Sequence, residues 1–247
     1  MTVAKPTAAL TSPLPRSQRP YVAATFAMTA DGKITTREYT PVDFTSREDK
    51  MHLLRQRALA DAVLIGHSTL KYDNVRLGLP KGELREKRLA RGQSLSPLRV
   101  IVSNAGGIDS SLNIFQTDIS PIVIFSTTRM PRRLQKELRA KATLHLSESG
   151  SVDLPWMLKQ LRTEYKVRSL ACEGGAKLFK SLLLADCVDQ LNLTVTPFLF
   201  GGKSAPNLLG TSLEVLPASV HCSLVTMRVV GAECFLTYRI RHRKFPA

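Results

Sequence analysis

Residues 170–185 read LACEGGAKLFKSLLLA, a stretch in which a strand-like run passes through one carboxylate and two glycines into a helix-like run. The apolar residues of Val167–Cys172 are typical of a buried strand, and the spacing after the glycines is typical of a helix. In open α/β sheets, ligands lie at such junctions because the free N–H groups of a helix start attract phosphate. Glu173 and its glycine pair are therefore either an ordinary turn or part of a ligand site.

The same alternation of strand-like and helix-like segments continues over residues 19–247 and predicts a single α/β domain. Helices are predicted at Ser46–Leu59, Met130–Ala140, Asp153–Glu164 and Ala176–Ala185. Strands are predicted at Tyr21–Met28, Ala62–Gly66, Arg99–Ser103, Ile122–Phe125, Val167–Cys172, Gln190–Thr196, Ser223–Val230 and Cys234–Arg241. The polar segment Pro80–Pro97 is predicted as a long connection, which is either functional or a solvated insertion.

Residues 1–18 are predicted to form a disordered tail, because they are rich in proline and poor in large apolar residues. They lack the apolar segment of a secretory signal, and an organelle transit peptide is the alternative. The four cysteines form no C-x-x-C pair, so we expect reduced thiols, no metal site and a cytoplasmic protein. No apolar run approaches the roughly 18–20 residues that cross a bilayer, so no membrane span is predicted.

The chain is basic, with 35 Lys and Arg against 20 Asp and Glu and a formal net charge of +15. The excess is spread along the sequence, without a block of five like charges or a recognisable nucleic-acid motif. Aromatic residues make up only 6%, which leaves little material for stacking bases. The composition therefore favours a basic, solvated surface over a nucleic-acid site.

Two more strand-like segments end in polar residues, at Gly66-His67-Ser68-Thr69 and at Ser103-Asn104. The chain has no G-x-G-x-x-G, no H-E-x-x-H and no recognisable Ser/His/Asp set, which argues against a Rossmann dehydrogenase and the common hydrolases. His67, taken alone, is also compatible with an ordinary surface histidine. A chain with several strand ends that can bind phosphate and with few nucleophiles suits cofactor chemistry, in which the protein mainly orients the reactants.

Several motifs in register then resemble a known family. They are AMTADGKI at 27–34, R-x-x-x-DAVLIG-x-x-T-x-x-x-D at 57–73, RVIVS at 99–103, EGG-x-x-L-x-x-S-x-x-x-x-x-x-VD at 173–189 and P-x-x-FGG-x-x-AP at 197–206. From Arg19 to Arg241 the chain looks like the RibD C-terminal family, the pyrimidine reductases of riboflavin biosynthesis. The resemblance implies a dihydrofolate-reductase-like α/β/α fold with three layers around a central mixed, mostly parallel sheet.

It also implies an oxidoreductase that uses NADPH, forms a homodimer and reduces the ribosyl group of a ribosylaminopyrimidine 5′-phosphate to ribityl. The positions that match the cofactor site are Ala27, Met28, His67, Thr69, Asp73, Ser103, Asn104, Gly174, Gly175, Ala176, Lys177 and Leu178. Those that match the substrate site are Arg57, Leu77 and Glu173, with Arg57 as a clamp for the sugar phosphate. Asp73 and Glu173 are the expected catalytic residues, handling the proton and the substrate hydroxyls.

The chain departs from many bacterial members at four positions on the substrate side. Thr25, Pro41, Asp43 and Val75 stand where those members have Lys, Ser, Trp and Pro. Two alternatives therefore stay open beside the pyrimidine reductase. One is a reductase of the same fold acting on another pterin-like or carbonyl substrate, and the other is a catalytically silent binding protein.

Overall fold

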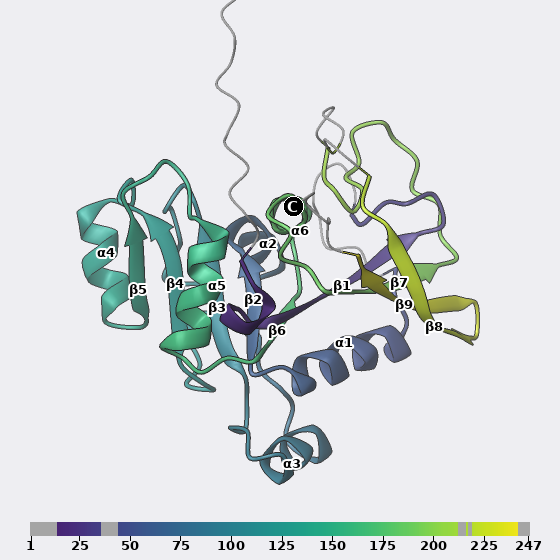
Figure 1. Ribbon diagram of the computed structural model, residues 1–247, viewed down its shortest axis with the longest axis horizontal. Helices are drawn as coiled ribbons and strands as arrows, with labels where there is room; N and C mark the ends of the chain where they lie inside the picture. The colour runs from purple at the N-terminus through teal and green to yellow at the C-terminus, as the bar shows by residue number, and fades with distance from the viewer. Residues whose placement is uncertain (1–13, 36–43, 212–215, 217–218, 242–247) are drawn as a thin grey trace, which may run out of the picture.

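The computed structural model describes residues 14–35, 44–211, 216 and 219–241, which form helices packed on both faces of a twisted sheet (Figure 1). The strands are β1 (Tyr21–Thr29), β2 (Ala62–Gly66), β3 (Leu98–Ser103), β4 (Ile122–Thr127), β5 (Thr143–Ser147), β6 (Ser169–Cys172), β7 (Gln190–Thr196), β8 (Cys222–Val230) and β9 (Glu233–Ile240). The helices are α1 (Arg47–Leu59), α2 (His67–Asp73), α3 (Glu83–Ala90), α4 (Arg132–Arg139), α5 (Leu154–Thr163) and α6 (Ala176–Leu184), with 3-10 turns η1 (Arg16–Gln18) and η2 (Asn113–Phe115).

The strands lie in the order β5-β4-β3-β2-β6-β1-β7-β9-β8. All neighbours from β5 to β7 are parallel, and only β9 and β8 add antiparallel pairs at one edge. The predicted three-layer architecture with a mixed, mostly parallel sheet is confirmed. Because parallel strands share one direction, the carboxyl ends of β1, β2, β3 and β6 meet at the same edge of the sheet.

Alternating side chains of the central strands give the sheet an apolar core on each face. Ala62 and Leu64 of β2 join a cluster with residues of α5 and α6, whereas Val63 and Ile65 join a second cluster with residues of α2 and α4. A strand buried on both faces reads as a continuous apolar run, which is why AVLIG predicted a buried strand. Each such aliphatic side chain contributes about 1.5–3 kcal/mol on burial.

The prediction that Pro80–Pro97 forms a loop is wrong, because this segment contains α3 (Figure 1). This helix has no apolar stripe of the kind that sequence patterns detect. Its buried Arg88 instead donates to the carbonyls of Ala58 at 3.1 Å, Ala60 at 2.5 Å and Ser94 at 2.7 Å. A guanidinium therefore fastens α3 to the end of α1, and this surface insertion is an ordered support for that helix.

The predicted tail also ends earlier than residue 18. Residues 1–13 lie outside the described part of the chain, but Arg16–Gln18 form η1. Arg16 and Arg19 both contact the carboxylate of Asp189, at 3.0 Å and 2.6 Å. An ion pair to a residue far along the chain is not visible in the local composition, which is why the prediction missed this turn.

Candidate functional site

A cleft of about 980 Å³ opens at the carboxyl ends of β1, β2, β3 and β6, beside the first turns of α2 and α6. This volume lies at the upper end of the range typical of small-molecule sites, about 300–1,000 Å³. The cleft therefore has room for a nucleotide cofactor together with a second ligand.

Most of the residues predicted from the sequence come together in this cleft. Those that line it are Ala27, His67, Thr69, Asp73, Ser103, Asn104, Glu173, Gly174, Gly175, Ala176, Lys177 and Leu178. Three predicted residues do not line it. Met28 and Leu77 pack into the apolar clusters, and Arg57 lies behind Glu173. The assignment of these residues to cofactor and substrate stays a prediction.

The glycine pair brings the start of α6 against α2. A Cβ at Gly175 would lie 2.5 Å from Thr69 Oγ1, and a Cβ at Gly174 would lie 3.0 Å from Thr69 Cγ2, so neither position has room for a side chain. Gly66 N donates to Gly174 O at 2.9 Å, which joins the turn to the end of β2. The turn therefore brings the start of α6 to the cleft. This helix begins without a side-chain cap, so its first backbone N–H groups have no side-chain acceptor there.

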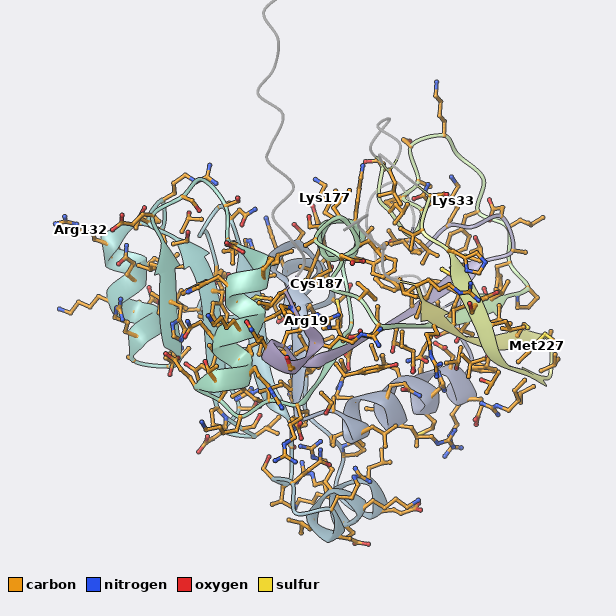
Figure 2. All side chains as sticks on the ribbon, viewed as in Figure 1. Arg19, Lys33, Arg132, Lys177, Cys187 and Met227 are labelled. Carbon is orange, nitrogen blue, oxygen red and sulfur yellow. The ribbon has the colours of Figure 1, made fainter. Side chains whose placement is uncertain are left out.

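The start of α6 offers an anion two sources of attraction. Its first N–H groups carry the positive end of the helix dipole. Lys177, on the first turn of α6 (Figure 2), is exposed and lines the cleft. A pyrophosphate is the kind of ligand that such a helix start binds.

Glu173 is held by a buried ion pair. Arg57 Nε donates to Glu173 Oε1 at 2.8 Å and Arg57 Nη2 donates to Oε2 at 2.6 Å, while Nη1 donates to Gly78 O at 2.6 Å. The side chains are only 10% and 4% exposed. Bidentate pairing fixes the carboxylate in one orientation. Arg57 thus positions Glu173 in this structure, and its role as a phosphate clamp stays a prediction.

Asp73 and His67 have shifted pKa values at the mouth of the cleft. Desolvation raises the pKa of the Asp73 carboxyl, although the residue remains exposed. Burial and the neighbouring Lys71 lower the pKa of His67, so the neutral imidazole dominates at pH 7. His67 is therefore suited to donate a hydrogen bond without carrying charge.

The structure also places residues in the cleft that the sequence did not single out as ligand-binding. They include Phe44, Thr45, Asp49 and Leu53 near the start of α1, and Ser151, Val152 and Leu154 before and at α5. Asp49 in a first helical turn is explained equally well by the helix dipole, so no sequence signal marked it. Of the four departures, Thr25 lines the cleft, Val75 packs on an apolar cluster, and Pro41 and Asp43 lie outside the described residues.

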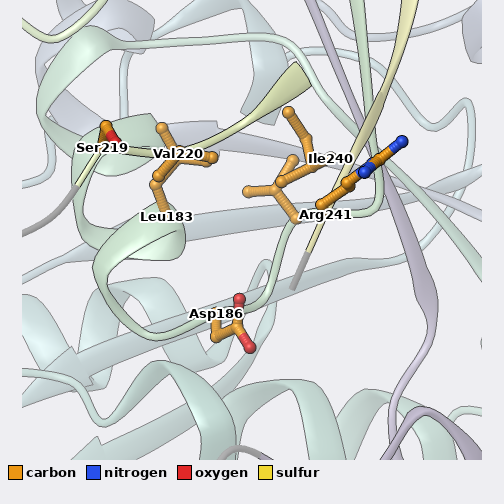
Figure 3. A pocket seen from close by; sticks show the side chains of 7 residues that line it. Leu183, Asp186, Ser219, Val220, Ile240 and Arg241 are labelled. Carbon is orange, nitrogen blue, oxygen red and sulfur yellow. The ribbon is translucent and has the colours of Figure 1, made fainter. Parts of the chain in front are cut away.

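Other site types find less support in the part of the chain that the structure describes. A second cavity, of about 20 Å³, lies among Leu183, Val220 and Ile240 (Figure 3) and has room for one water molecule at most. No three His, Cys, Asp or Glu residues gather there or elsewhere in the described ranges as metal ligands would. None of the described helices has the length and apolar character that a membrane crossing requires. The cytoplasmic location stays a prediction.

The chain is similar to several known proteins in sequence and in fold. The sequence model of the RibD C-terminal domain matches residues 20–236. The 2,5-diamino-6-ribosylamino-4(3H)-pyrimidinone 5′-phosphate reductase of Archaeoglobus fulgidus is 30% identical over 190 residues, covering 77% of this chain and 86% of the relative. The reductase of the same name from Methanothermobacter thermautotrophicus is 25% identical over 224 residues, covering 90% and 99%. A pyrimidine reductase-like protein of Corynebacterium diphtheriae has a similar structure, with a TM-score of 0.80, 20% identity and coverage of 94% and 96%.

Proposed function

The chain belongs to the RibD C-terminal domain family, and on that premise we propose that it reduces a ribosylaminopyrimidine 5′-phosphate in riboflavin biosynthesis with NADPH. The observation that carries the proposal is the single cleft that joins the Glu173-Gly174-Gly175 turn to the polar ends of β2 and β3. Its volume and its free helix start fit a dinucleotide beside a phosphorylated substrate.

The cofactor would lie along the strand ends, with its pyrophosphate at the start of α6 and its adenosine end toward Ser103 and Asn104. When bound, it supplies the hydride. Thr69 approaches the glycine turn closely enough that its hydroxyl also faces this region. The basic character of the chain favours a cofactor with an additional phosphate.

The substrate would lie on the Glu173 side of the cleft. Its reduction adds a hydride to sugar carbon 1 of the ring-opened imine and a proton to the imine nitrogen. Asp73, which lines the cleft at the end of α2, is our candidate for the residue that donates this proton. Glu173, fixed by Arg57, can accept hydrogen bonds from the sugar hydroxyls and hold the reacting carbon in place.

Turnover with each nicotinamide cofactor tests the proposal. We expect the purified chain to oxidise NADPH only when a ribosylaminopyrimidine 5′-phosphate is present, and to bind NADPH more tightly than NADH. Substrate-dependent loss of nicotinamide absorbance measures the first, and a fluorescence titration at moderate salt measures the second. If the chain binds the cofactor but does not turn over the substrate, it is a catalytically silent binding protein. Equal affinities for NADPH and NADH would contradict the choice of NADPH.

We further propose that the active form is a homodimer joined through β8. This edge strand exposes apolar side chains, with Leu224 54%, Met227 64% and Val229 63% exposed, and Met227 lies at its outer edge (Figure 2). An apolar edge strand invites pairing with another chain unless it is covered. Light scattering should give a dimer mass that Met227→Lys lowers, whereas Arg132→Glu, on exposed α4, should not change it. A monomer at all concentrations would refute this interface.

A further inference from the structure

Asp49 is a carboxylate in the cleft to which the reduction step gives no role. It lies in the first turn of α1, is 9% exposed and lines the cleft together with Thr25 and Leu53. A buried carboxylate is costly unless donors satisfy it. Its burial raises its pKa, and the hydroxyls of Thr194 and Thr45 act in the opposite direction. A ligand with N–H groups would stabilise the charged form further.

The first turn of α1 is held rigidly, so Asp49 has a fixed position. Ser46 Oγ accepts hydrogen bonds from the backbone N–H groups of Glu48 at 3.1 Å and Asp49 at 3.2 Å. Ser46 in turn donates from its N and Oγ to the carboxylate of Glu233, at 2.8 Å and 2.5 Å. A helix cap tied to β9 in this way preorganises whatever the turn presents to the cleft.

Asp49 and Glu173 face one gap between α1 and the sheet. Thr25 of β1 follows Ala24, which pairs with Cys172, so Thr25 lies beside Glu173 on one face. Arg57 reaches Glu173 from α1, which places α1 over this face. Asp49 precedes Arg57 by two helical turns, or about 12 Å along the axis. Both carboxylates line the same cleft, Glu173 beside Arg57 and Asp49 near the start of α1.

Because both residues line one cleft, a substrate whose sugar lies at Glu173 can place its heterocyclic base toward Asp49. A 2-aminopyrimidinone presents two adjacent donors, the 2-amino group and the ring N3–H, which match the two oxygens of a carboxylate. A uracil presents its 2-oxo oxygen at the place of the amino group. That oxygen would face a carboxylate oxygen, and acceptor against acceptor is repulsive.

We propose that Asp49 accepts hydrogen bonds from the 2-amino and N3–H groups of the substrate base, and that it selects the 2,5-diaminopyrimidinone over the uracil form. This inference rests on the proposed function, because it names the base that the same site takes. Asp49 is a binding residue in this scheme and does not handle the proton that reduction consumes. The diamino form is also the one in the names of the Archaeoglobus and Methanothermobacter relatives.

The experiment compares kcat/KM for 2,5-diamino-6-ribosylamino-4(3H)-pyrimidinone 5′-phosphate and for 5-amino-6-(5-phosphoribosylamino)uracil. We expect the unmodified enzyme to favour the diamino form by at least about tenfold, since unpaired buried polar groups discriminate strongly. Asp49→Asn should lose at least about tenfold on the diamino form. Its kcat/KM for the uracil form should rise relative to its kcat/KM for the diamino form, because the new amide N–H can donate to the 2-oxo oxygen.

Glu48→Gln is the matched control, since Glu48 lies on the same helical turn but pairs with Arg55 and Arg228 outside the cleft. It should leave the substrate ratio unchanged. If the unmodified enzyme reduces neither compound, the proposed function fails. If it reduces both equally well, or if Asp49→Asn keeps the original ratio, the proposed function stands and the role of Asp49 is overturned.

A binding measurement on the unmodified enzyme covers the case in which Asp49→Asn does not fold. The ribitylamino products of the two substrates compete for the same site. We expect the 2-amino product to inhibit at a concentration at least about tenfold lower than the 2-oxo product. Equal inhibition would overturn the inference without any variant.

Discussion

Glu173→Gln is expected to slow turnover of the ribosylaminopyrimidine phosphate by at least about tenfold, or about 1.4 kcal/mol of barrier. The amide keeps the size of the side chain but loses the charge, one acceptor oxygen and the basicity. Glu173 is not an exposed turn residue, because its side chain is 4% exposed and binds Arg57 through both oxygens. Loss of a group that holds the reacting carbon in place can cost about 10²-fold in rate.

The same change should also lower stability, because it leaves the buried guanidinium of Arg57 without a counter-charge. Breaking one partner of a buried pair costs on the order of 3–5 kcal/mol. NADPH affinity should stay nearly normal, since backbone N–H groups and not this side chain would hold the pyrophosphate. A fluorescence titration, a melting curve and steady-state kinetics on the folded protein separate the three effects. Glu164→Gln, on an exposed glutamate outside the cleft, is the control.

Turnover of Glu173→Gln close to that of the unmodified enzyme would remove Glu173 from the chemistry. The residue would then be a structural partner of Arg57 alone. A loss of NADPH affinity as large as the loss of rate would instead mean that the change disturbs the glycine turn beside it.

Asp189→Asn is expected to destabilise the protein by about 3–5 kcal/mol, without touching the cleft. Asp189 is 1% exposed and accepts two hydrogen bonds from Arg19, at 2.6 Å and 3.0 Å, and one from Val22 N at 2.8 Å. Arg16 pairs with the same carboxylate at 3.0 Å. The substitution leaves the buried Arg19 uncompensated at the start of β1 and β7.

The urea midpoint at constant slope measures this loss. Glu148→Gln, on an exposed glutamate, should stay within about 0.5 kcal/mol of the unmodified protein. Arg19→Met combined with Asp189→Asn should lose less than the sum of the two single changes, because the double variant buries no lone charge. Additive losses, or an Asp189→Asn effect as small as that of the control, would show that the pair does not hold the N-terminal turn in place.

Segments with an apolar run, an alternating apolar pattern or a clear helix cap were predictable from the sequence. The strands Ala62–Gly66 and Gln190–Thr196 have the predicted bounds, and Ser46–Leu59 differs from α1 only by its cap, Ser46. Besides the two 3-10 turns, the sequence missed two helices and one strand, namely α2, α3 and β5. Two of them are short, and α3 depends on a buried arginine, so local periodicity did not mark them. Tertiary contacts decided their conformation.

Some parts of the candidate site were likewise predictable from the sequence, and others were not. The glycine turn and the polar strand ends were predictable, because each is a local strand-to-helix junction. The partner of Glu173 was not, since Arg57 lies 116 residues away and was expected to bind phosphate. Asp49 carries no signal of its own, because an acid in a first helical turn is common on any soluble helix.

The α/β class and the junctions where a phosphorylated ligand can bind were readable from the residues alone, because they follow from period, polarity and turn residues along the chain, whereas the mostly parallel sheet was expected from the family resemblance. Only the tertiary structure decided that Arg57 holds Glu173, that Gly175 must be glycine to admit Thr69, and that Asp49 is buried in the same cleft. The physical reason is that burial and pairing are properties of the space between elements. Residues distant in the chain fill that space, and no local pattern records which of them meet.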